Sequence, residues 1–360
     1  MNFKALSLII MTVISAIYLC VFGTYEYVNY NFPSALKTIG SELRQVSYTA
    51  AESGKSKDKN TDVSDTHSDN GDTKDDSGKT DTDTQIDAVQ ASAAENAVGK
   101  IIPKFITPYG ANVKYNNVYL RNAAGANFDI AALLKNVLPF KIKKNSEPQV
   151  LLVHTHTTES FMLEDRDYYT SDDNPRSLDN NINMVAVGDV FEKKLRDAGI
   201  GVIHDTTVHD NPAYTGSYSR AAQTILKDLE AYPSIRIIID LHRDSISGGG
   251  SDKVKTVAEV QGKKCAQVML VMGSETGDIT NFPHWQDNLS LAVKYQQTME
   301  VMYPGLARAL ALNSGKYNEH ISRGSLLLEV GSEANTLDEA KAAAGYAADA
   351  LISLLNTVKE

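Results

Sequence analysis

The stretch VLLVHTHTTE, residues 150–159, decides the fold and points to the site. Its apolar half, VLLV, has no polar alternation, which is typical of a strand covered on both faces in a mostly parallel sheet. Its polar half, from His154 to Glu159, follows where that strand would end. In open α/β sheets, ligands lie beyond the carboxyl ends of the strands. We therefore expect functional residues in this run and at the ends of the other strands.

Similar apolar runs recur along the chain, and amphipathic segments separate them. Strands are expected at Val150–His154, Gly201–Asp205, Ile235–Leu241 and Ser325–Val330. Helices are expected at Ile182–Ala198, Ser217–Ala231, Asp287–Asn313 and Glu333–Leu355. This alternation predicts an α/β domain of three layers with a mostly parallel sheet. Lys255–Val260 and Cys265–Met272 flank Gln-Gly-Lys-Lys, which predicts an antiparallel pair at or near the sheet edge.

The amino-terminal residues have a different composition. Residues 5–23 carry no charge and are rich in Leu, Ile, Val and Met, and a run of about 20 apolar residues can cross a bilayer as a helix. A cleaved signal peptide is the alternative, but its apolar part is usually about 7–15 residues and precedes a small-x-small site. We predict an uncleaved anchor in residues 1–30, with its N-terminus inside because Lys4 is the nearby cation. The rest of the chain would then lie outside the cytoplasm, attached to the cell membrane.

Residues 31–98 are expected to be a juxtamembrane segment and an acidic, disordered linker. The part from Glu52 to Glu95 has twelve acidic and five basic residues, and so carries seven of the chain's ten net negative charges. Such a composition buries too little apolar surface to fold. The remaining chain is near neutral, which argues against a nucleic-acid partner because that would need a basic face.

The folded part is predicted to begin near residue 99. Residues 99–147 are expected to form a lead-in region with a β-hairpin around Ala-Ala-Gly, although its second half could begin a helix. Residues 148–360 are expected to form the catalytic domain. The two cysteines, Cys20 and Cys265, lie in the apolar span and in an apolar run, so a disulfide within this domain is excluded.

Three predicted strand ends carry groups suited to a metal: His154, His156 and Glu159, then His242, then Glu329. A hydrolytic zinc ion usually has three His, Asp or Glu ligands and one open position for water. The spacing His156-x-x-Glu159 lets both side chains converge if the chain turns after the strand, and His242 would come from a neighbouring strand. We assign these three residues to Zn²⁺.

Two further residues are predicted to act beside the metal. Glu329 would be a carboxylate at the end of a buried strand, suited to accept a proton, and a buried ion pair with Arg243 is the alternative. His154 lies two residues before His156 and would point to the same side if the strand continued. It could therefore be a ligand in place of His156, a supporting residue, or a catalytic group that acts in the transition state.

The motifs VLLVHTHTTES, IDLHRDS and LLLEVGSEANT, with a membrane anchor before them and a helix after them, together resemble the stage II sporulation protein P family of peptidoglycan hydrolases. The resemblance covers about Pro148 to the C-terminus. It implies a fold similar to that of the zinc N-acetylmuramoyl-L-alanine amidases, which is zinc exopeptidase-like, with His156 and His242 as ligands and Glu329 as the catalytic carboxylate. Those amidases draw their ligand Glu from the first helix, where this chain reads Leu-Asp-Asn-Asn. The third ligand is therefore Glu159 or, as the alternative, Asp179.

The resemblance also implies a biological setting. Its members cleave the amide between N-acetylmuramic acid and L-alanine, and also peptide cross-links, during engulfment of the forespore. The expected partners are a lytic transglycosylase, stage II sporulation protein D, and a membrane scaffold, stage II sporulation protein M. The catalytic domain would then work in the space between two membranes.

Two other functions fit the same residues. A metallocarboxypeptidase has the same order of ligands, and would need a cation such as Arg243 or Arg220 for the terminal carboxylate of its substrate. A wall-binding module that kept the fold and lost catalysis is the non-enzymatic alternative, and the complete ligand set argues against it.

Overall fold

The computed structural model describes residues 96–360 of the chain. The predicted membrane span at residues 5–23 and the acidic linker up to residue 95 lie outside the described residues. Within the described part, none of the helices combines the length and the apolar composition that crossing a bilayer requires.

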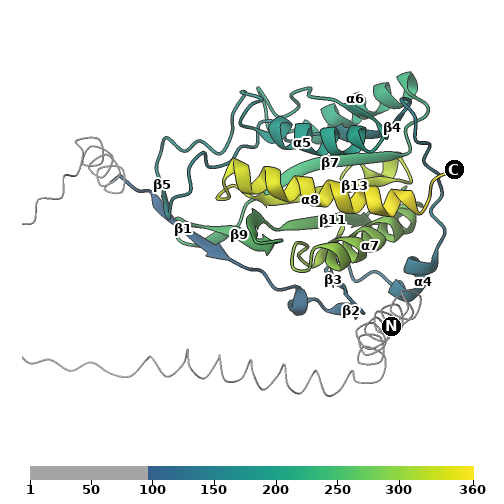
Figure 1. Cartoon of the computed structure of the whole chain (residues 1–360), viewed down its shortest axis with the longest axis horizontal. Helices are drawn as coiled ribbons and strands as arrows, with labels where there is room; N and C mark the ends of the chain where they lie inside the picture. Colours follow the sequence, from purple (N-terminus) through teal and green to yellow (C-terminus); the bar gives the residue numbers. More distant parts are fainter. Residues whose placement is uncertain (1–95) are drawn as a thin grey trace, which may run out of the picture. The chain divides into compact units, whose positions relative to one another are not determined.

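An eight-stranded mixed sheet is the centre of the described part (Figure 1). Its strands lie in the spatial order β2 (Val113–Tyr115), β3 (Val118–Asn122), β12 (Leu310–Ser314), β11 (Val268–Ser274), β13 (Ser325–Ser332), β7 (Ile237–Asp244), β4 (Pro148–Val153) and β6 (Gly201–His204). The last four are parallel to one another. β11, β12 and β3 form a second parallel block that runs the opposite way, and β2 is antiparallel to β3. The predicted α/β class is confirmed, with neighbouring strands that are mostly parallel.

Helices cover both faces of this sheet and so complete three layers. On one face, α5 (Met184–Asp197), α8 (Leu337–Asn356) and α7 (Trp285–Met302) lie side by side, and the short α4 (Ile130–Lys135) packs against α7 (Figure 1). On the other face, α6 (Ser217–Ala231) contributes Ile225 to a cluster with Leu151 and Val153 of β4. Short 3-10 turns lie at Pro108–Gly110 and Glu319–Ile321.

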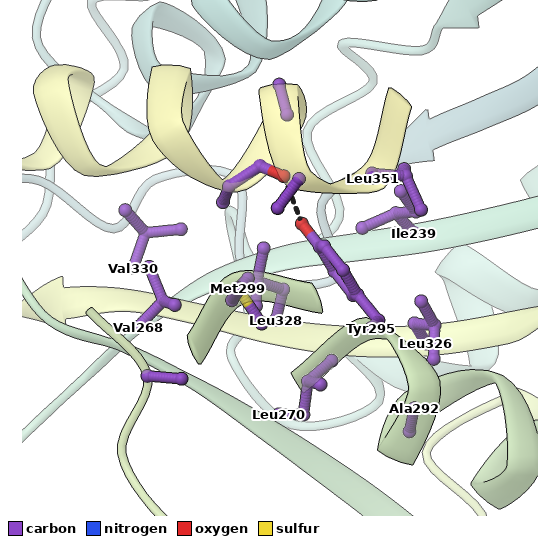
Figure 2. Packing of buried hydrophobic residues seen from close by; sticks show 14 of the residues in the cluster. Ile239, Val268, Leu270, Ala292, Tyr295, Met299, Leu326, Leu328, Val330 and Leu351 are labelled. Atoms are coloured by element: carbon purple, nitrogen blue, oxygen red, sulfur yellow. Dashed lines mark hydrogen bonds between the residues drawn. The ribbon is translucent and has the colours of Figure 1, made fainter. Parts of the chain in front are cut away.

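The main core lies between the sheet and α5, α7 and α8. Figure 2 shows Tyr295 of α7 among Leu270, Leu326 and Leu328 of the strands, with its hydroxyl aimed at α8. That hydroxyl donates a hydrogen bond of 2.8 Å to the carbonyl of Ala347, so the polar end of this buried ring is satisfied. α8 presents small side chains to this core and begins with a capping box between Thr336 and Glu339.

The predicted antiparallel pair is confirmed only in its first half. β9 (Asp252–Val260) pairs antiparallel with β10 (Lys263–Ala266) in a second sheet that also contains β1 (Gly99–Lys104), β5 (Tyr168–Tyr169) and β8 (Ser247–Gly249). The chain changes sheet at Gln267, whose buried side chain binds the backbone of Ile106 and Gly305. β11 therefore enters the middle of the main sheet, where an edge position was expected.

Residues 99–147 contribute strands to both sheets of the described part. β3 extends the main sheet by pairing with β12, and β1 pairs with β9. The hairpin turn lies at Asn116-Asn117, where Asn116 has a φ of 51°, and Ala-Ala-Gly instead leads into α4. Asparagine tolerates this left-handed conformation better than most residues.

The long helix predicted at Asp287–Asn313 is wrong in its second half. α7 ends at Met302, and Leu310–Ser314 is β12. Pro304 cannot donate the backbone hydrogen bond that a continuing helix would need, and Gly305 follows it with a φ of 86°. These two residues end the helix and return the chain to the sheet.

Candidate metal centre

The candidate centre lies where the carboxyl ends of β4, β7 and β13 meet. β7 is parallel to both neighbours, with Asp240 paired to Val153 of β4 and His242 paired to Glu329 of β13. The residues predicted from three separate motifs are therefore brought to one edge of the sheet. This is the edge at which open α/β sheets bind ligands.

His156, Glu159 and His242 form a buried group in which one potential ligand atom from each lies within 4.8 Å of the others. His156 Nδ1 lies 3.5 Å from Glu159 Oε1, and His242 Nδ1 lies 3.7 Å from Glu159 Oε2. Ligands at about 2.0–2.2 Å from a tetrahedral zinc ion would be about 3.4 Å apart. The three side chains therefore fit the prediction of a zinc site in type, number and spacing.

A tight turn after β4 brings His156 and Glu159 together. The backbone nitrogen of Glu159 donates to the carbonyl of His156 at 3.1 Å. Thr155 and Thr158 fix the two ends of this turn by hydrogen bonds to Asp240 and Asp210. The i, i+3 spacing thus places both side chains on the inner side of the turn without a helix.

In both His156 and His242 the Nδ1 atom is directed at Glu159, and the Nε2 atom faces a different partner. His156 Nε2 lies 3.1 Å from Ser217 Oγ, at the start of α6, and its ring stacks on Tyr214 at 4.5 Å. His242 Nε2 lies 3.0 Å from Asp240 Oδ1 in an ion-pair contact, although the geometry of the pair is not that of a hydrogen bond. Partners of this kind orient metal-ligating histidines in known sites.

The charge balance of the cluster favours a cation. Burial alone would lower the pKa of His242, but the charges of Asp240 and Glu159 outweigh it and raise that pKa to about 10. Burial would raise the pKa of Glu159, but His156, His242 and Arg243 hold it below its usual range. Asp240 and Glu159 thus lie beside His242 as buried carboxylates, and a bound cation would balance their charge.

Glu329 is partly exposed as a residue, but its Oε2 atom is buried. Within residues 96–360 this atom has no hydrogen-bond partner. Burial, together with the charges of Glu159 and Asp244, raises the pKa of Glu329 to about 8 against the opposing effect of His242 and Arg308. Glu329 is therefore a carboxyl group that can hold or release a proton near neutral pH beside the cluster.

Arg243 does not form the alternative ion pair with Glu329. Its guanidinium donates to the carbonyls of Ser160 at 2.8 Å, Pro175 at 2.6 Å and Asp244 at 3.3 Å, and its backbone nitrogen donates to Glu159 Oε2 at 3.1 Å. Arg243 thus holds the loop around Glu159 in place.

His154 does not join the cluster of His156, Glu159 and His242. Its Nδ1 lies 3.1 Å from the carbonyl of Leu241, and its Nε2 lies 2.9 Å from His204 Nε2. The ring is fully buried, on the side of the sheet covered by α5. β4 ends at Val153, so the alternation that would align the two histidines no longer holds.

Asp179 is also outside the cluster. Its side chain is exposed and accepts hydrogen bonds from the backbone nitrogen and the side chain of Asn181, at 2.9 and 2.7 Å. Of the two alternatives for the third ligand, Glu159 is therefore the residue that the structure brings to His156 and His242.

Several residues at the site were not predicted from the sequence. The ring of Tyr218 lies 5.6 Å from that of His156 and 6.4 Å from that of His242. Burial and the charge of Asp240 raise the pKa of Tyr218, so its hydroxyl keeps its proton. Arg176 lies 3.6 Å from Glu159 and also lines a polar pocket of 860 Å³ beside the cluster. These residues come from loops and from the first turn of α6, where no strand end marks them.

The fold and the site define a class: an α/β domain with a buried His-Glu-His cluster and an unpaired carboxyl at the carboxyl edge of its sheet. The family model described as stage II sporulation protein P (SpoIIP) matches residues 25–352. The chain belongs to this family.

Individual proteins similar to the chain were also found. Stage II sporulation protein P of Bacillus subtilis (strain 168) is 30% identical over 224 residues, which cover 59% of this chain and 52% of the relative. The chain thus spans about half the length of this curated relative. Among solved structures, the amidase CwlD of Clostridioides difficile, in complex with the GerS lipoprotein, has a TM-score of 0.38 at 12% identity, covering 59% of this chain and all of that one. The N-acetylmuramoyl-L-alanine amidase AmiC2 of Nostoc punctiforme has a TM-score of 0.36 at 11% identity, covering 59% and 97%. Both structural likenesses are distant.

Proposed function

We propose that the chain is a zinc-dependent peptidoglycan hydrolase that cleaves the amide between N-acetylmuramic acid and L-alanine, and also peptide cross-links, during sporulation engulfment. The observation that carries the proposal is the convergence of His156, Glu159 and His242 beside the unpaired carboxyl of Glu329. Membership in the stage II sporulation protein P family supports the wall substrate and the sporulation setting.

His156, Glu159 and His242 would hold the ion. Zinc bound there would lower the pKa of a water molecule and polarise the scissile carbonyl. Asp240 would keep the His242 ring in its orientation, and Ser217 would do the same for His156. Asp240 and Ser217 would thus fix the positions of the two histidine ligands before the substrate binds.

Glu329 would act as the general base and then as the general acid. Its Oε2 would accept a proton from the attacking water and return it to the amine that leaves when the amide breaks. A raised pKa suits this exchange, because the group must gain and lose a proton near neutral pH. Tyr218, whose hydroxyl stays protonated, could donate a hydrogen bond to the substrate at the same edge.

The carboxypeptidase alternative receives less support from the geometry. Both arginines that could bind a terminal carboxylate donate to backbone carbonyls: Arg243 as described above, and Arg220 to His209 at 2.6 Å, to Thr215 at 3.2 Å and also to Ala213. Arg176 is closer to solvent but is paired with Asp210 at 2.5 Å. A peptide bond within the wall or a sugar–peptide amide requires no such cation.

We further propose that residues 5–23 anchor the chain in the cell membrane with the N-terminus inside and the catalytic domain outside. The apolar composition of that segment supports this placement. The proposed partners are the lytic transglycosylase and the membrane scaffold named above, stage II sporulation proteins D and M. The transglycosylase is expected to act on the same wall, because glycan cleavage and amide cleavage together release it.

Digestion of purified peptidoglycan tests the proposed reaction, with products identified by mass spectrometry. An amidase releases intact stem peptides with a free L-alanine amine, whereas loss of single terminal residues would indicate a carboxypeptidase. His242→Asn should abolish cleavage and the zinc binding of this cluster, and His284→Asn, outside the cluster, is the matched control. Binding to the wall without any cleavage by the zinc-loaded protein would contradict the proposal and indicate a binding module.

A further inference from the structure

A second group of potential metal ligands lies on the other side of β4 from His156. It consists of His204 at the end of β6 and of Asp189 and Glu192 on α5. His204 Nδ1 lies 3.3 Å from Asp189 Oδ1 and 3.3 Å from Glu192 Oε2. The i, i+3 spacing places both carboxylates on one face of the helix, directed at the same ring.

The hydrogen bonds of His154 determine which nitrogen of His204 carries a proton. His154 Nδ1 must donate to the carbonyl of Leu241, because a carbonyl can only accept. The ring of His154 is fully buried, where a positive charge would be costly, so its Nε2 accepts the hydrogen bond from His204 Nε2. His204 Nδ1 then directs a lone pair at two carboxylates unless a cation or a proton lies between them.

The distances favour a metal ion over a proton. An N–H···O hydrogen bond to one carboxylate would be about 2.9–3.0 Å long, and a proton would favour one acceptor. Two equal separations of 3.3 Å instead match the spacing of about 3.4 Å between ligands of a tetrahedral ion. The side chain of His204 is 3% exposed and Glu192 is 23% exposed, while Asp189 is 63% exposed, so the outer side of the group is open to water.

The surrounding residues fit this group closely. A Cβ atom at Gly188 would lie 2.5 Å from His204 Nε2 and 3.0 Å from His154 Nε2, so α5 approaches both rings at a position where only glycine fits. Arg196 binds the other oxygen of Glu192 at 2.6 Å, which leaves Oε2 for the ion. His154 also orients His204 through its second nitrogen, as outer partners do for metal-ligating histidines.

We propose that His204, Asp189 and Glu192 bind a divalent transition-metal ion, separate from the cluster of His156, Glu159 and His242. One nitrogen and two carboxylate ligands suit zinc, manganese or cobalt. Because Asp189 is mostly exposed and water completes the coordination, binding is weaker than at the buried cluster. The ion joins α5 to the end of β6 and fixes the His204–His154 pair.

Metal content at equilibrium tests the proposal on the full-length chain in detergent. The chain is dialysed against buffered free zinc, and bound zinc is counted by mass spectrometry. Wild type should bind two equivalents at high free zinc, and the Asp189→Asn, Glu192→Gln double variant should bind one. His242→Asn should lose the zinc ion of the His156, Glu159 and His242 cluster and keep the other one. The two variants therefore test the two sites independently.

Two controls distinguish the loss of a metal ion from the effects of lost charge and of misfolding. Asp197→Asn with Glu230→Gln removes the same charge from exposed positions and should keep both equivalents. Asp189→Asn alone changes an exposed side chain, so it should fold and still lower the affinity of the second site at least tenfold. Equal zinc content in wild type and in both Asp189 variants would overturn the proposal and identify His204 as a protonated imidazolium.

Discussion

Thr155 donates two hydrogen bonds to the carboxylate of Asp240, one from its backbone nitrogen at 2.8 Å and one from its hydroxyl at 2.6 Å. The same carboxylate lies 3.0 Å from His242 Nε2. Thr155 follows the end of β4, and Asp240 belongs to β7. This pair therefore ties together the two chain segments that supply the candidate ligands.

Thr155→Val should weaken zinc binding without removing a ligand. Valine keeps the shape of threonine and the backbone hydrogen bond but loses the hydroxyl that orients Asp240. Loss of such outer partners typically costs about 10–100-fold in metal affinity or activity. Competition with a zinc chelator measures the change. The exposed Thr206→Val is the matched control, and equal affinities in both variants would show that the hydroxyl does not support the site.

Glu329→Gln should abolish most hydrolysis while leaving zinc content unchanged. The amide keeps the size of the carboxyl but cannot take a proton from water, and general acid–base groups contribute about 100- to 10,000-fold to rate. Release of stem peptides from purified wall measures activity, and circular dichroism checks the fold. Glu259→Gln, an exposed change on β9, should keep full activity. Normal cleavage by the Glu329 variant would remove Glu329 from the mechanism.

Much of the site could be predicted from sequence because its residues follow apolar strands. His156, Glu159, His242 and Glu329 each stand next to a run such as VLLV, RIII or SLLL, and parallel strands bring such ends to one edge. Tyr218 and Arg176 could not be found this way, since a helix start and a loop place them there. The direction of His154 depended on whether the strand continued past it, and β4 ends at Val153.

The fold could be predicted where local pattern and tertiary structure agree. Ser217–Ala231 forms the expected helix because its apolar residues recur on one face. Leu310–Ser314 was assigned to a helix because its apolar residues also suit one, and Pro304 was the overlooked signal. The change of sheet at Gln267 depends on contacts with Ile106 and Gly305, which are distant in sequence. Such long-range contacts leave no local pattern.

Gly188→Ala should destabilise the domain, although alanine is usually the better residue in a helix. The added methyl group would lie 2.5 Å from His204 Nε2, so the ring or the helix must move. Overpacking of this kind costs about 1–3 kcal/mol. Urea unfolding followed by circular dichroism measures the loss.

Gly345→Ala in α8 is the matched control for that substitution. The nearest atoms to its new methyl group would be side-chain carbons of Lys194 and Val190 at 3.8 Å, an ordinary contact distance. This variant should gain up to about 1 kcal/mol from helix propensity. A similar gain in stability in the Gly188→Ala variant would mean that α5 does not lie in close contact with the rings of His204 and His154.

Glu319→Gln should change how the stability of the domain depends on pH. Glu319 is fully buried, its Oε2 accepts a hydrogen bond from the backbone nitrogen of Gly273 at 2.8 Å, and its Oε1 has no partner within residues 96–360. Burial raises the pKa of this carboxyl well above its ordinary value of 4.5. The folded chain therefore keeps a proton that the unfolded chain releases above about pH 4.5.

Because the folded state binds the extra proton, wild-type stability should fall as pH rises from 4.5 towards the folded pKa of Glu319. The slope contributed by this one group approaches about 1.4 kcal/mol per pH unit. Glutamine keeps the hydrogen bond from Gly273 and cannot ionise, so the variant should lack this slope. Urea unfolding of both proteins at several pH values between about 5 and 8 gives the difference in unfolding free energy, in which the other titrating groups cancel. That difference should grow with pH in favour of the variant, and a constant difference would mean that Glu319 is ionised in the folded chain.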